Sequence, residues 1–174
     1  MRLFIISGKS GTGKNELANM IKEYYEVKNE KSLITEYSKY VKIMAREALN
    51  WDGTREHKPR KFLQDMGQVF RATLGEDIFI KRMQEDIQVY SQYYDNIIIS
   101  DARLKKELNM MKEKYSECYT IHLTSNIKNS LTLVEQNHIT ETELDNYNMV
   151  DYQLDSSDLN KLKISIENIL EVIK

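Results

Sequence analysis

A glycine-rich segment near the start of this 174-residue chain lies directly between a short apolar run and an amphipathic stretch. The apolar run covers 3–6, and the stretch that follows the glycines carries Leu17, Ala18 and Ile21 at helical spacing. The segment has the G-x-x-x-x-G-K spacing of a phosphate-binding loop. Its residues are Gly8, Lys9, Ser10, Gly11, Thr12, Gly13, Lys14 and Asn15. Because such a loop requires a strand before it and a helix after it, the segment predicts an α/β fold.

The chemistry expected of this loop is anion binding. Glycines let backbone N–H groups converge on phosphate oxygens, Lys14 supplies a positive charge, and the next helix presents its positive end. Asn15 stands where Ser or Thr usually follows the lysine. Its amide oxygen is an acceptable ligand for Mg²⁺, which prefers oxygen and keeps several waters. We therefore expect phosphate at 8–15 and place Asn15 in the metal shell.

Four further short segments resemble strands, and helical patterns separate them. The predicted strands are 3–6, 32–35, 97–99, 118–123 and 150–154. The predicted helices are 15–27, 37–49, 59–73, 76–93, 104–114 and 158–173. Unbroken apolar runs indicate strands covered on both faces, and the alternation predicts a three-layer α/β/α fold with a parallel sheet of about five strands. Without an internal repeat or linker, residues 1–174 are predicted to form one domain.

Composition narrows the class of partner. The chain is 41% hydrophobic with a formal net charge of −2, which gives no overall attraction to nucleic acid or to anionic membranes. Cys118 is the only cysteine, which excludes an intrachain disulfide and fits a reducing compartment. Without an apolar run near the ~18 residues of a membrane span, we expect a cytoplasmic protein with a small-molecule substrate.

The strand at 97–99 runs into Ser100 and Asp101. Because parallel strands share one carboxyl edge, Asp101 is expected to face Lys14 across a ligand crevice, as a metal ligand or catalytic carboxylate. The alternative is a helix cap. Arg103 follows two residues later and is suited to clamp a transferring phosphoryl group, unless it is only a solvated surface arginine.

The predicted helix 59–73 has two distinct faces. One face is apolar and consists of Phe62, Leu63, Met66, Val69 and Phe70. The opposite face consists of Arg60, Gln64, Gly67 and Arg71. Two arginines, an amide and a glycine suit a phosphate ester with a base packed close to the backbone. A solvated polar face is the alternative, but it leaves the helix-weakening glycine without a reason.

Taken together, four segments resemble the phage-type deoxynucleoside monophosphate kinases of the P-loop nucleoside monophosphate kinase family. They are GKSGTGKN, WDGTREHKPRKFLQDMGQVFR with GEDIFIKRM, IIISDAR, and HITETELD, and they span nearly the whole chain in the expected order. The resemblance implies ATP and Mg²⁺ at 8–15, and Asp101 with Arg103 beside the phosphates. It places the acceptor near Lys39, Arg60, Gln64 and Arg71. It also implies a homodimer, an acceptor-binding helical region at about 37–94 and a lid-like segment at about 125–148.

The lid is where the chain departs from that family. Related kinases carry arginine there, whereas 126–135 contains no arginine and only Lys128 as a cation. His138, with Glu141 and Glu143, is interpreted as lid architecture, His122 as structural, and His57 as a loop residue able to approach substrate. The leading hypothesis is a transferase that phosphorylates a (deoxy)nucleoside monophosphate in nucleotide metabolism. A kinase of another phosphorylated or hydroxylated metabolite, and a nucleotide-binding regulatory module without turnover, remain open.

Overall fold

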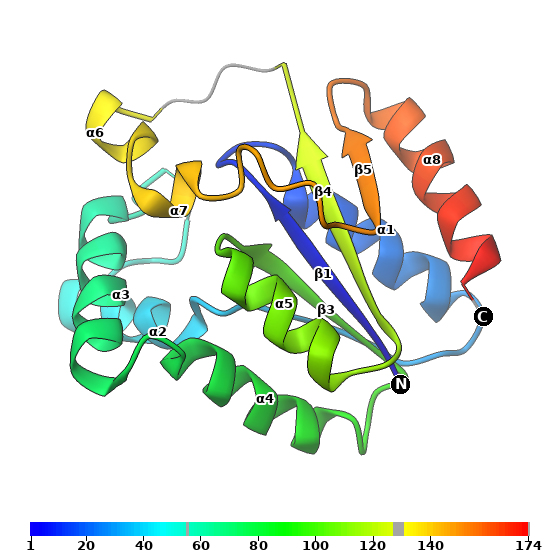
Figure 1. The fold of residues 1–174 in the computed structure, drawn as a ribbon, viewed down its shortest axis with the longest axis horizontal. Coiled ribbons are helices and arrows are strands. Elements are labelled where there is room, and N and C mark those ends of the chain that lie inside the picture. Colours follow the sequence, from blue (N-terminus) through cyan, green and yellow to red (C-terminus); the bar gives the residue numbers. More distant parts are fainter. Residues whose placement is uncertain (55, 127–130, 174) are drawn as a thin grey trace.

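A five-stranded parallel sheet forms the centre of the computed structural model, which describes residues 1–54, 56–126 and 131–173 (Figure 1). The strand order is β2-β3-β1-β4-β5. The strands are β1 (Arg2–Gly8), β2 (Ser32–Thr35), β3 (Asn96–Ala102), β4 (Cys118–Thr124) and β5 (Tyr152–Asp155). The strands expected from the sequence are therefore confirmed, as is the parallel three-layer fold.

Helices cover both faces of this sheet (Figure 1). They are α1 (Lys14–Glu26), α2 (Lys39–Leu49), α3 (Arg60–Leu74), α4 (Ile78–Tyr90), α5 (Lys105–Lys114), α6 (Leu133–Gln136), α7 (Ile139–Thr142) and α8 (Leu159–Val172). Buried residues of α1 and α8 form one core, and those of α2, α3, α4 and α5 form the other.

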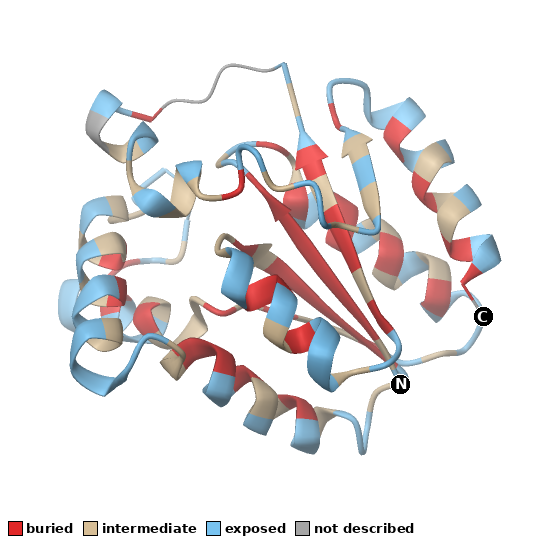
Figure 2. Cartoon of the chain, viewed as in Figure 1, coloured by how far each residue is buried: buried red, intermediate tan, exposed pale blue. Residues whose placement is uncertain are grey.

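The central strand β1 supplies both cores. Leu3 and Ile5 pack on the side of α2 to α5, while Phe4 and Ile6 pack on the side of α1 and α8, and all four are fully buried. Burial of each such side chain stabilises the fold by about 1.5–3 kcal/mol, so an unbroken apolar run is required here (Figure 2). The two cores therefore pack on both faces of β1, whose carboxyl end leads into the glycine-rich loop.

The predicted helix boundaries lie within a few residues of the observed ones. Pro59 stands at the N-cap of α3, and the Asp158 side chain accepts the N–H groups of Asn160 and Lys161 at the start of α8. Two short helices, α6 and α7, were not predicted. Each has only four residues, too few to show helical periodicity, although Thr132 and Glu135 form a capping box at α6.

The carboxyl edge of the sheet contains an irregularity. β1 pairs with β3 from Arg2↔Asn96 to Ile5↔Ile99, but the next paired residues are Ser7↔Ala102, so β3 holds one extra residue next to Asp101. Such a bulge re-aims the side chains beside it. Elsewhere, Cys118 is buried in β4, and burial raises the pKa of its thiol to about 12.

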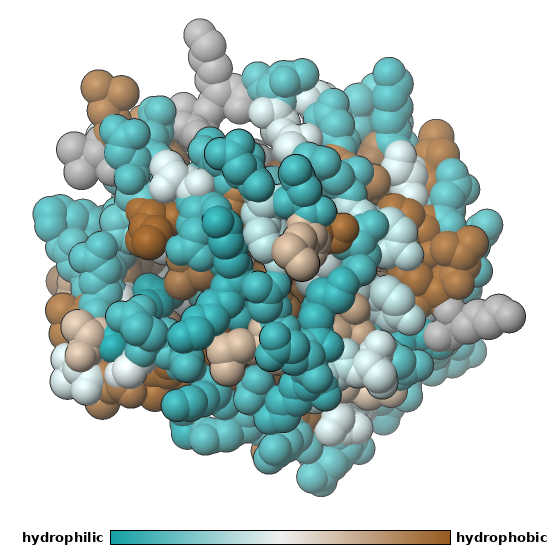
Figure 3. Space-filling view, in the orientation of Figure 1, coloured by the Kyte–Doolittle hydropathy of each residue, from teal (hydrophilic) through white to brown (hydrophobic). Residues whose placement is uncertain are grey.

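The outer surface is mostly hydrophilic in the face shown in Figure 3. No helix within the described ranges combines the length and apolar character that a membrane crossing requires.

Candidate active site

The glycine-rich loop connects β1 to α1 with a tightly constrained backbone. Gly8 has a φ of 140°, and a Cβ at that position would lie 2.4 Å from the carbonyl oxygen of Leu123. Gly13, with a φ of 78°, is the N-cap of α1. A side chain is therefore excluded at Gly8 by contact and disfavoured at Gly13 by conformation. The loop meets the geometric requirement that its sequence predicted.

Lys14 lies in the centre of this loop and is folded back on it. Its Nζ donates to the carbonyl oxygens of Gly8, at 2.8 Å, and Lys9, at 2.6 Å, and the residue is only 8% exposed. Burial, with the nearby Arg103 guanidinium, lowers the pKa of the Lys14 ammonium well below its usual range. A buried ammonium whose hydrogen bonds, among the described residues, go to neutral carbonyl oxygens is a site where an anion would be stabilised.

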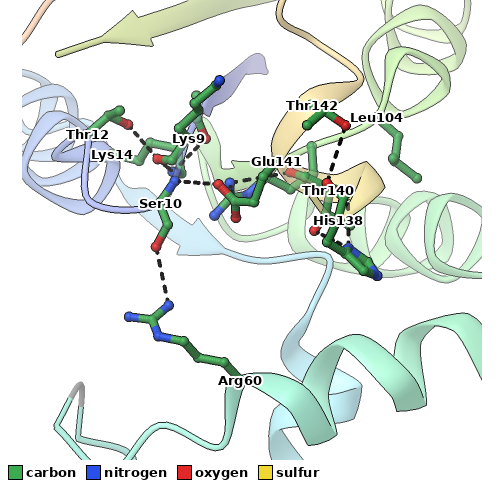
Figure 4. A network of polar contacts seen from close by, with 12 residues as sticks. Lys9, Ser10, Thr12, Lys14, Arg60, Leu104, His138, Thr140, Glu141 and Thr142 are labelled. Atoms are coloured by element: carbon green, nitrogen blue, oxygen red, sulfur yellow. Dashed lines mark hydrogen bonds and ion pairs between the residues drawn. The ribbon is translucent and has the colours of Figure 1, made fainter. Parts of the chain in front are cut away.

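The carboxylate of Glu141, from α7, lies against the same loop (Figure 4). Its Oε2 accepts the backbone N–H of Ser10 at 2.8 Å, and its Oε1 pairs with Arg103 Nη1 at 2.8 Å. Two neighbouring contacts hold the same segment: Lys9 with Asp145 at 2.8 Å, and the Lys105 N–H donating to Glu143 Oε1 at 2.8 Å. An internal carboxylate thus engages one backbone N–H of the loop and the predicted phosphoryl clamp.

Asp101 lines the same cavity as Lys14, but its oxygens also hold the start of α2. Oδ1 accepts the N–H of Tyr37 at 2.7 Å, while Oδ2 accepts the N–H and hydroxyl of Ser38 at 3.1 and 2.6 Å. Asp101 therefore fixes the two residues that precede α2, and it does not accept an N–H group of the first turn of that helix in any of these bonds.

A cavity of about 530 Å³ joins the loop to the polar face of α3. Of the predicted site residues, it is lined by Ser10, Gly11, Gly13, Lys14, Asn15, Arg60, Gln64, Arg71, Asp101 and Arg103. Arg60 Nη1 also donates to Ser10 Oγ at 3.2 Å (Figure 4). Gly67 lines the cavity and is buried, which supplies the close backbone surface expected on α3. The apolar face of α3 is narrower than predicted, because Val69 is 50% exposed.

The remaining predicted site residues lie outside the cavity wall. Lys39 is turned toward α4, where its Nζ lies 2.5 Å from Asp86 and 2.9 Å from the Tyr90 hydroxyl, so the structure does not bring it to the other acceptor candidates. Gly8 and Lys9 offer their carbonyl oxygens to Lys14. Thr12 donates its hydroxyl to the Lys9 carbonyl at 2.9 Å.

Several residues that sequence reasoning missed also line the cavity. They are Glu36, Lys42, Arg46, Lys58, Phe79 and Glu107. Burial, with the charges of Lys42 and Arg60, lowers the pKa of Lys58 to about 8. On a helix or loop these charges look like ordinary surface residues, so only their tertiary placement reveals them.

The charge of the cavity wall is positive overall. Among the described lining residues, the cations are Lys14, Lys42, Arg46, Lys58, Arg60, Arg71 and Arg103, and the carboxylates are Glu16, Glu36, Asp101, Glu107 and Glu141. Seven positive and five negative side chains leave a formal excess of two positive charges. A chain with a net charge of −2 therefore concentrates positive charge in one cavity, which favours an anionic ligand.

The segment predicted to be lid-like contains α6 and α7, and α7 places Glu141 against the glycine-rich loop. His138 caps α7 and contacts Gln68 of α3 at 2.8 Å, as expected of an architectural residue. Lys128, the one lid cation expected from the sequence, lies outside the described residues. His122 contacts Ser7 Oγ at 2.9 Å within the sheet, and His57 pairs with Asp52 at 2.7 Å in an exposed loop.

The chemistry of Asn15 and Asp101 is compatible with Mg²⁺, because both carry oxygen ligands on the cavity wall. A carboxylate offers about four acceptor positions, and three at Asp101 are used by Tyr37 and Ser38. In the part of the chain that the structure describes, no group of three or more His, Cys, Asp or Glu is placed to hold a metal.

Comparison with known proteins gives a fold likeness at low sequence identity. No protein family model matches the chain, and neither does any curated protein sequence. Among solved structures, shikimate kinase from Bacteroides thetaiotaomicron matches with a TM-score of 0.56 at 13% identity, over 98% of this chain and 99% of that one. Shikimate kinase from Aquifex aeolicus matches with a TM-score of 0.54 at 17% identity, over 98% and 96% of the two chains.

A third match is the APS kinase CysC of Mycobacterium tuberculosis in complex with AMPPNP and APS. Its TM-score is 0.52 at 12% identity, with 98% of this chain and 97% of that chain covered. These likenesses show that the chain has the three-layer α/β fold found in small kinases.

Proposed function

We propose that this chain transfers the γ-phosphoryl group of ATP to a (deoxy)nucleoside monophosphate and releases ADP and the diphosphate. The observation that carries the proposal is the single cavity shared by the glycine-rich loop and by Arg60, Gln64 and Arg71 of α3. A phosphate-binding loop supplies a place for the donor, and a cationic helix face with an amide supplies one for an anionic acceptor that carries a base.

The donor side would be held by the loop and by Lys14. Backbone N–H groups of 8–14 and the positive end of α1 suit the β- and γ-phosphates, and these anions would favour the charged form of the buried Lys14. Asn15 and Asp101 would hold Mg²⁺, which supplies neutralisation of phosphate charge when bound. AMPPNP in the APS kinase complex, a protein with the same fold, supports ATP as the donor.

The reaction needs positioning more than acid–base chemistry. An ionised oxygen of the acceptor phosphate attacks the γ-phosphorus, the bond from that phosphorus to the β–γ bridging oxygen breaks, and ADP leaves with the bond electrons. No side chain has to remove a proton. Arg60 and Arg71 would orient the acceptor phosphate, Gln64 would meet the base, and Arg103 would stabilise charge on the transferring group.

The proposal is tested by ADP release measured with a panel of acceptors. The panel contains each NMP and dNMP, and also shikimate, gluconate and adenosine phosphosulfate as non-nucleotide or modified-nucleotide arms. We expect turnover that requires a monophosphate and depends on its base. Turnover with a non-nucleotide acceptor, and with none of the monophosphates, would show that the acceptor is not a nucleoside monophosphate. ATP binding without acceptor-dependent ADP release would contradict a kinase and favour a non-catalytic nucleotide-binding module.

A further inference from the structure

Glu107 is a buried carboxylate in the wall of the cavity that none of the roles above uses. It lies in the first turn of α5, and its side chain is only 3% exposed. Burial raises the pKa of Glu107 to about 7, although the backbone N–H groups that it accepts act in the opposite direction. Burial of a carboxylate costs free energy unless the group is paired or hydrogen-bonded, so the contacts of Glu107 indicate its role.

One oxygen of Glu107 serves the turn that carries Arg103. Oε2 accepts the backbone N–H of Arg103 at 2.7 Å and that of Leu104 at 3.0 Å. These bonds satisfy free N–H groups at the beginning of α5 and hold the backbone of Arg103 in place. Arg103 in turn places its guanidinium in the cavity beside the loop.

The second oxygen points to the acceptor side. Oε1 lies 3.6 Å from Nη2 of Arg71, which comes from α3 and also packs over the ring of Phe79 at 5.0 Å. The Tyr37 hydroxyl donates to the carbonyl oxygen of Glu107 at 3.0 Å, while the Tyr37 N–H holds Asp101. Glu107 therefore connects the turn after β3, helix α3 and the turn after β2 at one buried point.

Capping alone does not account for this arrangement. The cap uses one oxygen, and a buried ion pair contributes little net stability compared with apolar packing, because both charges lose their water. The second oxygen lies beside an arginine of the acceptor face, within ion-pair distance of its guanidinium.

We propose that Glu107 is a positioning residue that sets Arg71 toward the acceptor phosphate while it anchors the backbone of Arg103 beside the donor. This inference rests on the proposed function. In this inference one carboxylate sets the separation between Arg71, which holds the acceptor, and Arg103, which faces the transferring group.

The test is Glu107→Gln, measured by steady-state kinetics and by calorimetric binding of the monophosphate. Glutamine keeps one oxygen for the N–H groups of Arg103 and Leu104, but it presents an NH₂ group to Arg71. We expect the KM and Kd for the monophosphate to rise about tenfold, equivalent to about 1.4 kcal/mol, with the KM for ATP nearly unchanged. In an Arg71→Gln background the same substitution is expected to have almost no further effect on acceptor binding.

Asp158→Ala is the control, because it removes the side-chain cap of α8, a helix that does not line the cavity. It is expected to lower the melting temperature without changing either KM. If Glu107→Gln does not fold, Glu107→Asp keeps the charge but withdraws it from Arg71 by one methylene, and the same rise in acceptor KM is expected.

A rise in both KM values together, a loss of melting temperature alone, or an undiminished effect in the Arg71→Gln background would overturn the inference. Calorimetry separates this outcome from failure of the proposed function, since wild-type protein without turnover can still be tested for monophosphate binding. If wild-type protein binds no monophosphate, the inference is overturned as well. Normal wild-type turnover with unaltered Glu107→Gln kinetics overturns the inference alone.

Discussion

The positive side chains in the two halves of the cavity, the donor side at the glycine-rich loop and the acceptor side near α3, differ in their contacts. On the donor side, Lys14 donates to two loop carbonyl oxygens, and the Ser10 N–H and Arg103 are engaged by Glu141. On the acceptor side, Arg71 lies 3.6 Å from Glu107 and Lys42 pairs with Glu36, whereas Lys58 and Arg46 have no carboxylate partner within ion-pair distance among the described residues.

This difference indicates how a triphosphate and a monophosphate would each have to bind. A triphosphate at the loop must displace an internal carboxylate, so part of its binding free energy is spent on breaking existing contacts. A monophosphate beside α3 also meets Lys58 and Arg46 on the cavity wall, and binding to these two cations breaks no ion pair among the described residues. The four predictions that follow test this contrast, beginning with the largest expected effect.

Lys14→Met is expected to reduce turnover by at least about 10²-fold, because the charge that neutralises the transferring group is removed. The fold is expected to survive, since the substitution removes a buried ammonium and keeps an unbranched side chain in α1. ADP release and thermal unfolding by circular dichroism measure the two effects. Lys22→Met, on the same helix but away from the cavity lining and paired with Glu26, is the control. Unchanged turnover in Lys14→Met would refute the assignment of the loop.

Arg60→Gln is expected to raise the KM for the monophosphate by about 10- to 100-fold, which corresponds to loss of a charge-assisted hydrogen bond of about 1.5–3 kcal/mol. The KM for ATP is expected to change much less, because Arg60 touches the loop only through Ser10 Oγ among the described contacts. Lys61→Gln removes the neighbouring charge, which is exposed and paired with Asp65, and is expected to have no such effect. Equal changes in the KM for the monophosphate and the KM for ATP would contradict the assignment of Arg60 to the acceptor side.

Glu141→Gln is expected to tighten ATP binding by up to about tenfold, because a neutral amide competes less well than a carboxylate for Arg103. Calorimetric titration with a non-hydrolysable ATP analogue measures the change. Glu143→Gln is the matched control, since Glu143 holds the same segment through the Lys105 N–H without touching the loop. Weaker ATP binding in Glu141→Gln would show that this carboxylate assists the donor instead of competing with it.

The last prediction concerns pH and the acceptor half. Because the pKa of Lys58 is about 8, a rise from pH 7.5 to 9 removes most of its charge and is expected to weaken monophosphate binding severalfold. The pH dependence is expected to be smaller in Lys58→Met. The effect on stability has the opposite sign. Between about pH 8 and the usual lysine value of 10.5, the unfolded chain binds more protons at this residue, so its contribution to stability rises with pH. Parallel pH profiles in the two proteins would contradict a role for Lys58 in anion binding.

The strands and the polar face of α3 could be predicted from the sequence, whereas the position of Lys39 could not. Leu3 to Ile6, the isoleucines of β3 and the apolar residues of β4 could only be buried between two helical layers, so the sheet was predictable. Arg60, Gln64 and Arg71 were predicted together because helical spacing places them on one face. Lys39 shares that helical region but turns toward Asp86, a residue 47 positions later, and no local pattern announces that ion pair.

The sequence by itself determined the order of strands and helices, the glycine-rich loop and the polar face of α3, because these depend on spacing between near neighbours. Only the tertiary structure decided which charges meet. Glu141 reaches Ser10 across 131 positions, and Glu107 reaches Arg71 across 36, through contacts that depend on how helices pack over the sheet. Such contacts produce no periodic pattern in the sequence, because a charged residue that lines a cavity has the same residue type as one exposed to solvent.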